Sequence, residues 1–162
     1  MTLPQAVEEF NARYFPWRRR WIYTTLSYTN GGPYMAPQPT NVTVLIGAIE
    51  ANPASRDQAQ EYIQLVNPHP YPVDISGWRL TGAVDYRFKG GVVLPTNGVL
   101  YVSPDVNAFR ARATAPRGGM GLFVQGNYQG QLNARGEVLQ LVDKSGRVVT
   151  ATNTPAAPSL PQ

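Results

Sequence analysis

Two short runs in the middle of the chain decide the fold: Glu61-Tyr62-Ile63-Gln64-Leu65 and Asp74-Ile75-Ser76-Gly77-Trp78. In the first run, Ile63 and Leu65 fall on one face of an extended chain, which is the period-two pattern of a strand with a buried side. In the second run, the Ser-Gly pair predicts a turn that sends Trp78 into the core at the start of a new strand. The two runs therefore predict a sheet of short strands connected by tight turns.

The same pattern continues on both sides of these runs. Strands are expected at residues 44–49, 62–66, 78–80, 86–88, 92–94, 99–103, 122–125, 138–142 and 147–151. The sequences Pro95-Thr96-Asn97-Gly98 and Asp143-Lys144-Ser145-Gly146 are typical of turns, and the second is expected to close a hairpin. Many short antiparallel strands predict an all-β fold of the sandwich type. Its expected core includes Ile49, Ile63, Leu65, Trp78, Leu80 and Leu141.

Residues 3–26 are the region with a helical pattern. The aromatic residues recur at spacings that place them on one helix face: Phe10, Tyr14, Trp17 and Trp21. Pro16 is penalised inside a helix, so we expect a break near Phe15. Because an aromatic face of this size must pack on something, it either covers the β domain or is the severed end of a preceding domain.

The pattern divides the chain into four parts. Residues 1–27 form the helical extension, and residues 28–42, where glycine, proline and threonine replace the periodic pattern, form a linker. Residues 43–151 form the sandwich. The last segment, 152–162, is rich in proline and alanine, and we expect a disordered tail or the start of another linker.

The composition excludes several kinds of chemistry. The chain of 162 residues has no cysteine, which rules out disulfides, thiolate zinc sites and a cysteine nucleophile. It has no apolar run near the roughly 20 residues that cross a bilayer, and no signal-peptide pattern at its start. The formal net charge of +4 is moderately basic, and this charge alone does not favour nucleic-acid binding.

Taken in order, these residues resemble a lamin tail domain, the immunoglobulin-like sandwich of nuclear lamins and of many exported or surface-exposed bacterial proteins. The resemblance runs from about Val44 to Val149. Besides the two runs quoted above, its most specific parts are Asn52-Pro53, Gly130, Leu132-Asn133, Gly136-Glu137, Leu141 and Gly146. The resemblance implies that Trp78 is the core tryptophan of an immunoglobulin-like sandwich, here without the disulfide that antibody domains place beside it.

The chain departs from the bacterial pattern at three places. Ala48 and Gln64 stand where glutamate is usual, and Lys89 follows Phe88 where a Phe-Pro pair is usual. A function built on acidic side chains at the first two positions is therefore not expected. The resemblance implies a non-catalytic binding or scaffolding module of a larger bacterial protein that lies outside the cell, on its surface or in the periplasm.

A second resemblance concerns the N-terminal region. The run Phe15-Pro16-Trp17-Arg18-Arg19-Arg20-Trp21, followed by Tyr23, resembles the closing helix of the spore-coat protein H (CotH) type of atypical kinase. Bacterial kinases of this type often carry a lamin tail domain behind them. On this alternative, the chain is the C-terminal fragment of such a kinase, and the catalytic residues lie upstream.

The sequence itself assembles no catalytic or metal site. His69 is the only histidine and lies in a proline-bound loop, so we expect a surface histidine rather than a member of a triad. Asp57, Glu61, Asp74 and Asp85 are scattered rather than spaced like a calcium loop, which favours capping and surface roles. We therefore expect no catalytic residue, no metal and no cofactor.

Candidate contact residues lie in one long loop. Arg110, Arg112 and Arg117 form a basic stretch between two expected strands, suited to phosphates, acidic polysaccharide or a partner protein. The expected partner is a protein or a cell-surface ligand, and an edge strand could also pair with a partner strand. The alternative is a nucleic-acid or polyanion-binding domain that uses these arginines. The nearby Gly118-Gly119-Met120-Gly121 lacks the lysine and the following helix of a phosphate loop, so we interpret it as a loop or bulge.

Overall fold

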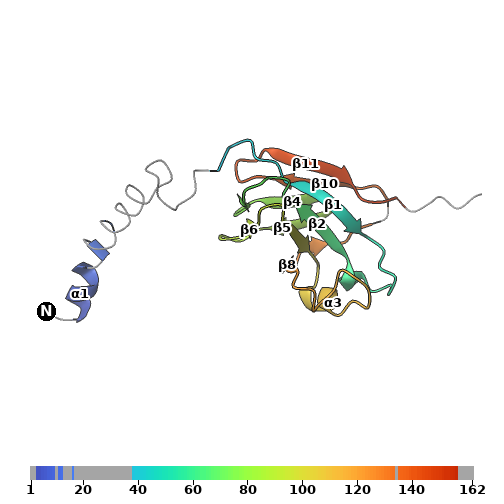
Figure 1. Cartoon of the computed structure of the whole chain (residues 1–162), viewed down its shortest axis with the longest axis horizontal. Coiled ribbons are helices and arrows are strands. Elements are labelled where there is room, and N and C mark those ends of the chain that lie inside the picture. Colours follow the sequence, from blue (N-terminus) through green and yellow to red (C-terminus); the bar gives the residue numbers. More distant parts are fainter. Residues whose placement is uncertain (1–2, 10, 13–15, 17–37, 134, 157–162) are drawn as a thin grey trace, which may run out of the picture. The chain divides into compact units, whose positions relative to one another are not determined.

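The computed structural model describes residues 3–9, 11–12, 16, 38–133 and 135–156 (Figure 1). The chain forms two compact units, Met1–Pro39 and Thr40–Gln162. In the first unit, the helix α1 spans Leu3–Glu9, within the region that has the helical pattern. The aromatic residues of the expected helix face (Phe10, Tyr14, Trp17 and Trp21) and the expected break near Phe15 lie outside the described residues.

One sheet of the second unit has four strands in the order β1-β2-β7-β8. Their bounds are Leu45–Glu50 for β1, Tyr62–Val66 for β2, Val99–Val102 for β7 and Phe123–Gln125 for β8. The pairs β1–β2 and β2–β7 are antiparallel, whereas β7 and β8 are parallel. Leu65 lies opposite Leu100, and both side chains are fully buried on the inner face of the sheet. This register keeps the apolar side of β2 and β7 together, as a period of two requires.

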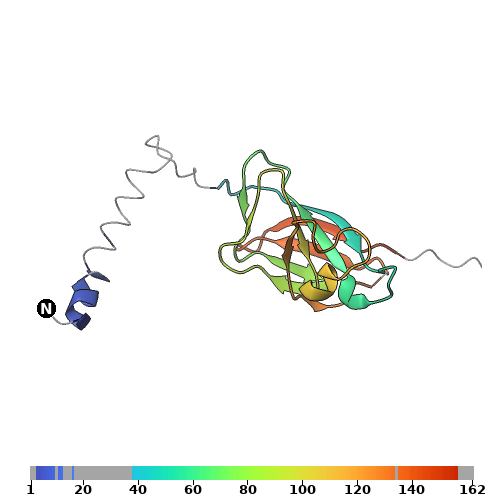
Figure 2. The ribbon, with the colours of Figure 1, turned by 60° about the horizontal axis from the view of Figure 1, so that its bottom comes forward.

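The second main sheet has five antiparallel strands in the order β11-β10-β4-β5-β9. Their bounds are Val148–Asn153 for β11, Val138–Val142 for β10, Arg79–Gly82 for β4, Val84–Arg87 for β5 and Gln129–Gly130 for β9. A two-stranded ribbon pairs β3 (Val73–Asp74) with β6 (Val93–Leu94). In Figure 1, β11 lies along the top of this unit and the short helix α3 (Val106–Arg110) at its bottom, and Figure 2 shows the same arrangement turned by 60°.

An apolar core fills the space between the two main sheets and makes the unit an all-β sandwich. Trp78, immediately before β4, is 3% exposed and lies within this core. On the neighbouring strands, Leu80 and Leu141 lie opposite each other and are fully buried. The expected core residues Ile63 and Leu65 are likewise fully buried, and Ile49 is partly buried against the core.

The β10–β11 hairpin is closed by the turn that the sequence predicts. The Asp143 N–H donates to the Arg147 carbonyl at 2.9 Å, and the Gly146 N–H donates to the Asp143 carbonyl at 3.0 Å. Hydrogen bonds from the Ser145 hydroxyl and from Arg147 lower the pKa of Asp143 to about 2. The Arg147 guanidinium also donates to the Val42 carbonyl at 2.9 Å, so this turn holds the segment that leads into β1.

The folded unit extends past the boundaries expected for the sandwich. Val42, which the sequence places in the linker, is buried in the core. At the other end, β11 continues to Asn153, and Thr154 is buried. The Thr154 hydroxyl donates to the Asn133 carbonyl at 2.8 Å and accepts from the Glu137 N–H at 2.9 Å. These contacts attach residues 152–154 to the sandwich.

Several short elements have no counterpart among the expected strands. The strands β3 and β9 have two residues each, and the 3-10 helix η3 spans Gln58–Gln60. The helix α3 replaces the start of the expected long loop between β7 and β8. Asp105 caps it, since its Oδ1 accepts from the N–H groups of Asn107 at 2.8 Å and Ala108 at 3.1 Å. This cap fixes where the chain turns after β7.

Candidate binding site

The helix α3 and the loop after it bring two arginines together. Arg110 ends α3, and Arg117 precedes Gly118, whose backbone N–H donates to the Arg110 carbonyl at 2.9 Å. This bond folds the loop back on the helix, so that Arg110 and Arg117 line one pocket of about 310 Å³. The other lining residues are Gly118, Gly119, Gly121, Leu122 and Val124. We call this site the basic pocket.

Arg112 does not line the basic pocket, which corrects the expectation that three arginines share one exposed surface. The residue is only 7% exposed. Its guanidinium carbon lies 5.0 Å from the centroid of the Tyr62 ring, and its Nη1 donates to the Gln60 carbonyl. A guanidinium is tolerated in the interior only with such contacts. Arg112 therefore anchors the loop to β2 and η3.

The position of Arg112 follows from an aromatic cluster on the outer face of the four-stranded sheet. Phe109 on α3 is fully buried, and its ring centroid lies 5.8 Å from that of Tyr62 and 5.5 Å from that of Tyr101. This contact holds the residues that follow Phe109 over Tyr62. The local sequence around Arg112 carries no signal of its burial, because the two tyrosines belong to strands that are distant along the chain.

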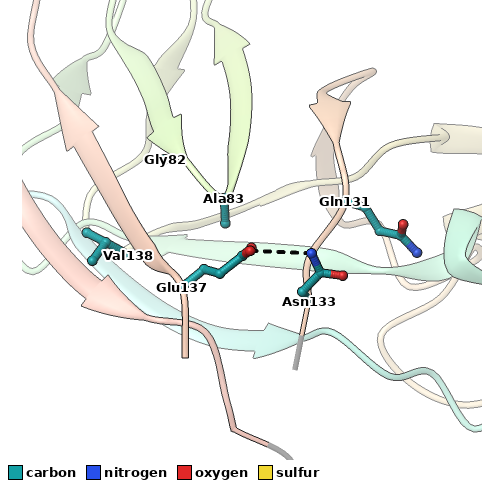
Figure 3. Close-up of a pocket in the computed structure, with 6 residues that line it drawn as sticks. All are labelled: Gly82, Ala83, Gln131, Asn133, Glu137 and Val138. Atoms are coloured by element: carbon teal, nitrogen blue, oxygen red, sulfur yellow. Dashed lines mark hydrogen bonds between the residues drawn. The ribbon is translucent and has the colours of Figure 1, made fainter. Parts of the chain in front are cut away.

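A second pocket, of about 520 Å³, lies between the β4–β5 turn and the start of β10 (Figure 3). Its lining residues are Gly82, Ala83, Gln131, Asn133, Glu137 and Val138. The Asn133 amide donates to Glu137 Oε1 at 3.4 Å. The Gln131 side chain is directed away from this pair in Figure 3, and its amide donates to Gln58 Oε1 at 2.8 Å. The polar groups of this pocket thus bond to one another or to η3.

Glu61 is a carboxyl inside the fold, only 1% exposed. Its Oε2 accepts from the Tyr128 hydroxyl at 3.0 Å and from the Leu132 N–H at 3.1 Å, while its buried Oε1 has no partner among the described residues. Burial raises the pKa of Glu61, against the smaller lowering effect of the two hydrogen bonds. The side chain therefore joins the residue before β2 to residues on both sides of β9.

The other acidic residues considered for calcium each have a separate hydrogen-bonded role in the fold. Asp57 accepts from the Ala59 N–H at 3.0 Å at the start of η3. Asp74 accepts from the Ser76 N–H at 2.8 Å, and Asp85 accepts from the Arg79 Nε at 2.7 Å. Within the described part of the chain, no three His, Asp or Glu side chains are grouped so that they could hold a metal ion.

The family model described as Lamin Tail Domain matches residues 37–155. The chain belongs to the lamin tail domain family. Lamin tail domains are generally non-catalytic interaction modules, and no catalytic family matches the chain. No curated protein matches it.

The lamin tail domain match begins after the N-terminal region. No match supports the resemblance of residues 15–23 to the CotH-type kinase, and all of these residues except Pro16 lie outside the described part of the structure. Among the described helices, none has the length and apolar character needed to cross a membrane.

A hydrogen bond joins Ala48 and Gln64, two positions at which the chain departs from the bacterial pattern that it resembles. The β1–β2 register shifts between Ile46 and Ile49, which leaves an irregularity at Gly47 and Ala48. Gln64 Oε1 accepts from the Ala48 N–H at 3.0 Å, and Gln64 Nε2 donates to the Tyr101 hydroxyl at 3.2 Å. The glutamine thus closes the irregularity and ties it to β7.

The histidine of this lamin tail domain also has a structural contact. His69 Nε2 accepts from the Thr43 N–H at 3.2 Å, and the His69 ring stacks on Tyr71 with centroids 4.8 Å apart. The proline-bound loop therefore holds the segment that leads into β1.

Proposed function

We propose that this lamin tail domain is a non-catalytic binding or scaffolding module of a larger, exported bacterial protein, and that its partner is a protein or a cell-surface ligand. The observation that carries the proposal is which ionisable side chains already have partners within the fold. Glu61, Asp85 and Asp143 form hydrogen bonds within the fold. Arg110 and Arg117 line the basic pocket, and their side chains have no ion-pair partner among the described residues. The two basic residues of this pocket therefore remain for an external contact, and they lie together.

The place of the basic pocket in the fold supports the same proposal. It lies on the connection between β7 and β8, which Arg112 and Phe109 fix to the outer face of the four-stranded sheet. Loops that a rigid scaffold holds in place are where binding residues concentrate. A location outside the cell, on its surface or in the periplasm follows the resemblance to exported bacterial proteins.

The binding role is tested by cross-linking in cells that produce the full-length protein. The double variant Arg110→Gln/Arg117→Gln removes both charges of the basic pocket. The control, Arg87→Gln/Lys89→Gln, removes the same charge from exposed positions outside the pocket. We expect the first variant to lose the cross-linked partner and the control to retain it. Equal recovery of the partner from both variants would contradict the proposed contact surface.

The proposed location has its own test. Protease added to intact cells should cleave the lamin tail domain if it lies on the cell surface, and should cleave it after the outer barrier is opened if it lies in the periplasm. Protection of the domain until the cytoplasmic membrane is broken would contradict export.

A further inference from the structure

We propose that the basic pocket binds one compact oxyanion, a phosphate or sulfate group. This inference rests on the proposed binding function and deepens it, because it names the chemical group that the partner presents. The shared chemistry is a tetrahedral anion with several acceptor oxygens, whether a phosphorylated partner or a sulfated polymer supplies it.

The charges of the basic pocket favour an anion. Its lining contains two basic residues, Arg110 and Arg117, and no acidic residue. The acidic residue on the same helix, Asp105, lies at the opposite end of α3 and uses Oδ1 to accept from two backbone N–H groups. Two cationic residues that line one pocket repel each other, and an oxyanion that both can bond removes this repulsion.

The backbone of the glycine-rich loop adds neutral donors beside these charges. The φ angle is 80° at Gly119 and 66° at Gly121, whereas Met120 between them lies outside the positive-φ region. Residues with positive φ are one component of the concave nests of backbone N–H groups that bind anions. Gly119 and Gly121 line the pocket, and their N–H groups donate to no described residue. They are therefore available to an oxyanion.

Gly118 sets the approach of this loop to α3. A Cβ atom at this position would lie 2.7 Å from the Arg110 carbonyl oxygen and 3.2 Å from the Arg110 Cβ. A larger residue would push the loop away from the helix and separate Arg117 from Arg110. The glycine thus allows the two arginines to line the same pocket.

The size of the basic pocket fits one small group. Its volume of about 310 Å³ is at the lower end of the range for small-ligand pockets, roughly 300–1,000 Å³. The planar fork of a guanidinium matches two oxygens of a phosphate or sulfate at once. The pocket therefore suits a single oxyanion held between two arginines and the loop amides.

The test is a titration of the full chain, labelled with ¹⁵N, with inorganic phosphate and separately with inorganic sulfate at constant ionic strength. We expect saturable shifts of the amide signals of residues 118–121. In Arg110→Gln/Arg117→Gln, the affinity should fall at least about tenfold, because each lost charged hydrogen bond is worth that much or more. In the control Arg87→Gln/Lys89→Gln, the affinity should be unchanged. Shifts that do not saturate, or that weaken equally in both variants, would overturn the site.

A glycine variant separates the shape of the pocket from its charge. Gly118→Ala retains both arginines but should weaken phosphate binding, whereas Gly90→Ala, where nothing lies within 4 Å of the added Cβ, should not. Equal affinity of the two alanine variants would contradict the role of the loop. Titrations with a phosphoserine peptide and with a heparin tetrasaccharide then distinguish the two sources of the anion. The compound that resembles the natural ligand should shift the amide signals of residues 118–121 more strongly than the other. If the partner still depends on Arg110 and Arg117 while phosphate leaves residues 118–121 unmoved, the oxyanion site is wrong and the binding role stands.

Discussion

The guanidinium of Arg112 lies over the ring of Tyr62, which makes this arginine part of the packing on the outer face of the four-stranded sheet. We expect Arg112→Ala to lower the free energy of unfolding by about 1–3 kcal/mol, because it removes the ring contact and the hydrogen bond to Gln60. The same change at the exposed Arg110 or Arg117 should alter it by about 0.5 kcal/mol or less. Urea denaturation measures all three variants, and equal losses at positions 110 and 112 would contradict the anchoring role of Arg112.

The variant Trp78→Ala tests the packing of the core. We expect Trp78→Ala to lower the free energy of unfolding by about 3–5 kcal/mol, because the indole leaves a cavity between the two sheets. Val148→Ala is a suitable control, since Val148 is 46% exposed on β11. Thermal and chemical unfolding measure both changes. A melting temperature of the Trp78 variant close to that of the control would show that the indole is not enclosed.

We expect Glu61 to make the free energy of unfolding depend on pH. Burial raises its pKa above the ordinary value of 4.5. Between pH 4.5 and the raised pKa, the folded state keeps a proton that the unfolded chain releases, so stability falls as pH rises through this window. We expect Glu61→Gln to remove this part of the slope, because glutamine does not ionise and can still accept from Tyr128 and Leu132.

This prediction is measured by urea unfolding of both proteins at several pH values from 4.5 to 7. As pH rises, the free energy of unfolding of the wild type should fall relative to that of Glu61→Gln. Parallel curves over the whole range would show that the carboxyl does not keep its proton more tightly in the fold.

Gln64 closes the irregularity in β1. We expect Gln64→Ala to lower the free energy of unfolding by about 1–2 kcal/mol, because both hydrogen bonds of the side chain are lost. Gln64→Glu should cost less, since a carboxylate still accepts from the Ala48 N–H and from the Tyr101 hydroxyl. Hydrogen exchange of the Ala48 amide gives a local readout. Unchanged protection in the alanine variant would contradict the contact.

The strands with strong local signals could be predicted from the sequence. The bounds of β2 and β10 agree with the expected strands 62–66 and 138–142, and the Asp143–Gly146 turn closes the expected hairpin. These elements combine apolar residues at a period of two with flanking residues that strongly favour turn conformations. Trp78 could be placed in the core for the same reason.

The elements that depend on distant partners could not be predicted. The helix α3 has five residues, too few to show a helical period, although the cap at Asp105 was a usable signal. The two-residue strands β3 and β9 exist through their pairing with β6 and β5. Arg112 reads as one of three similar surface arginines, and only the packing of Phe109 on Tyr62 places it inside. The basic pocket therefore contains two of the three expected contact residues.

The contacts of Arg147 with Val42 and of Thr154 with Glu137 fix the two ends of the domain at opposite ends of β11. This strand has six residues, which corresponds to roughly 20 Å. A tensile force on the polypeptide that flanks the domain would run parallel to β11. The hydrogen bonds between β10 and β11 would then be sheared together rather than unzipped singly.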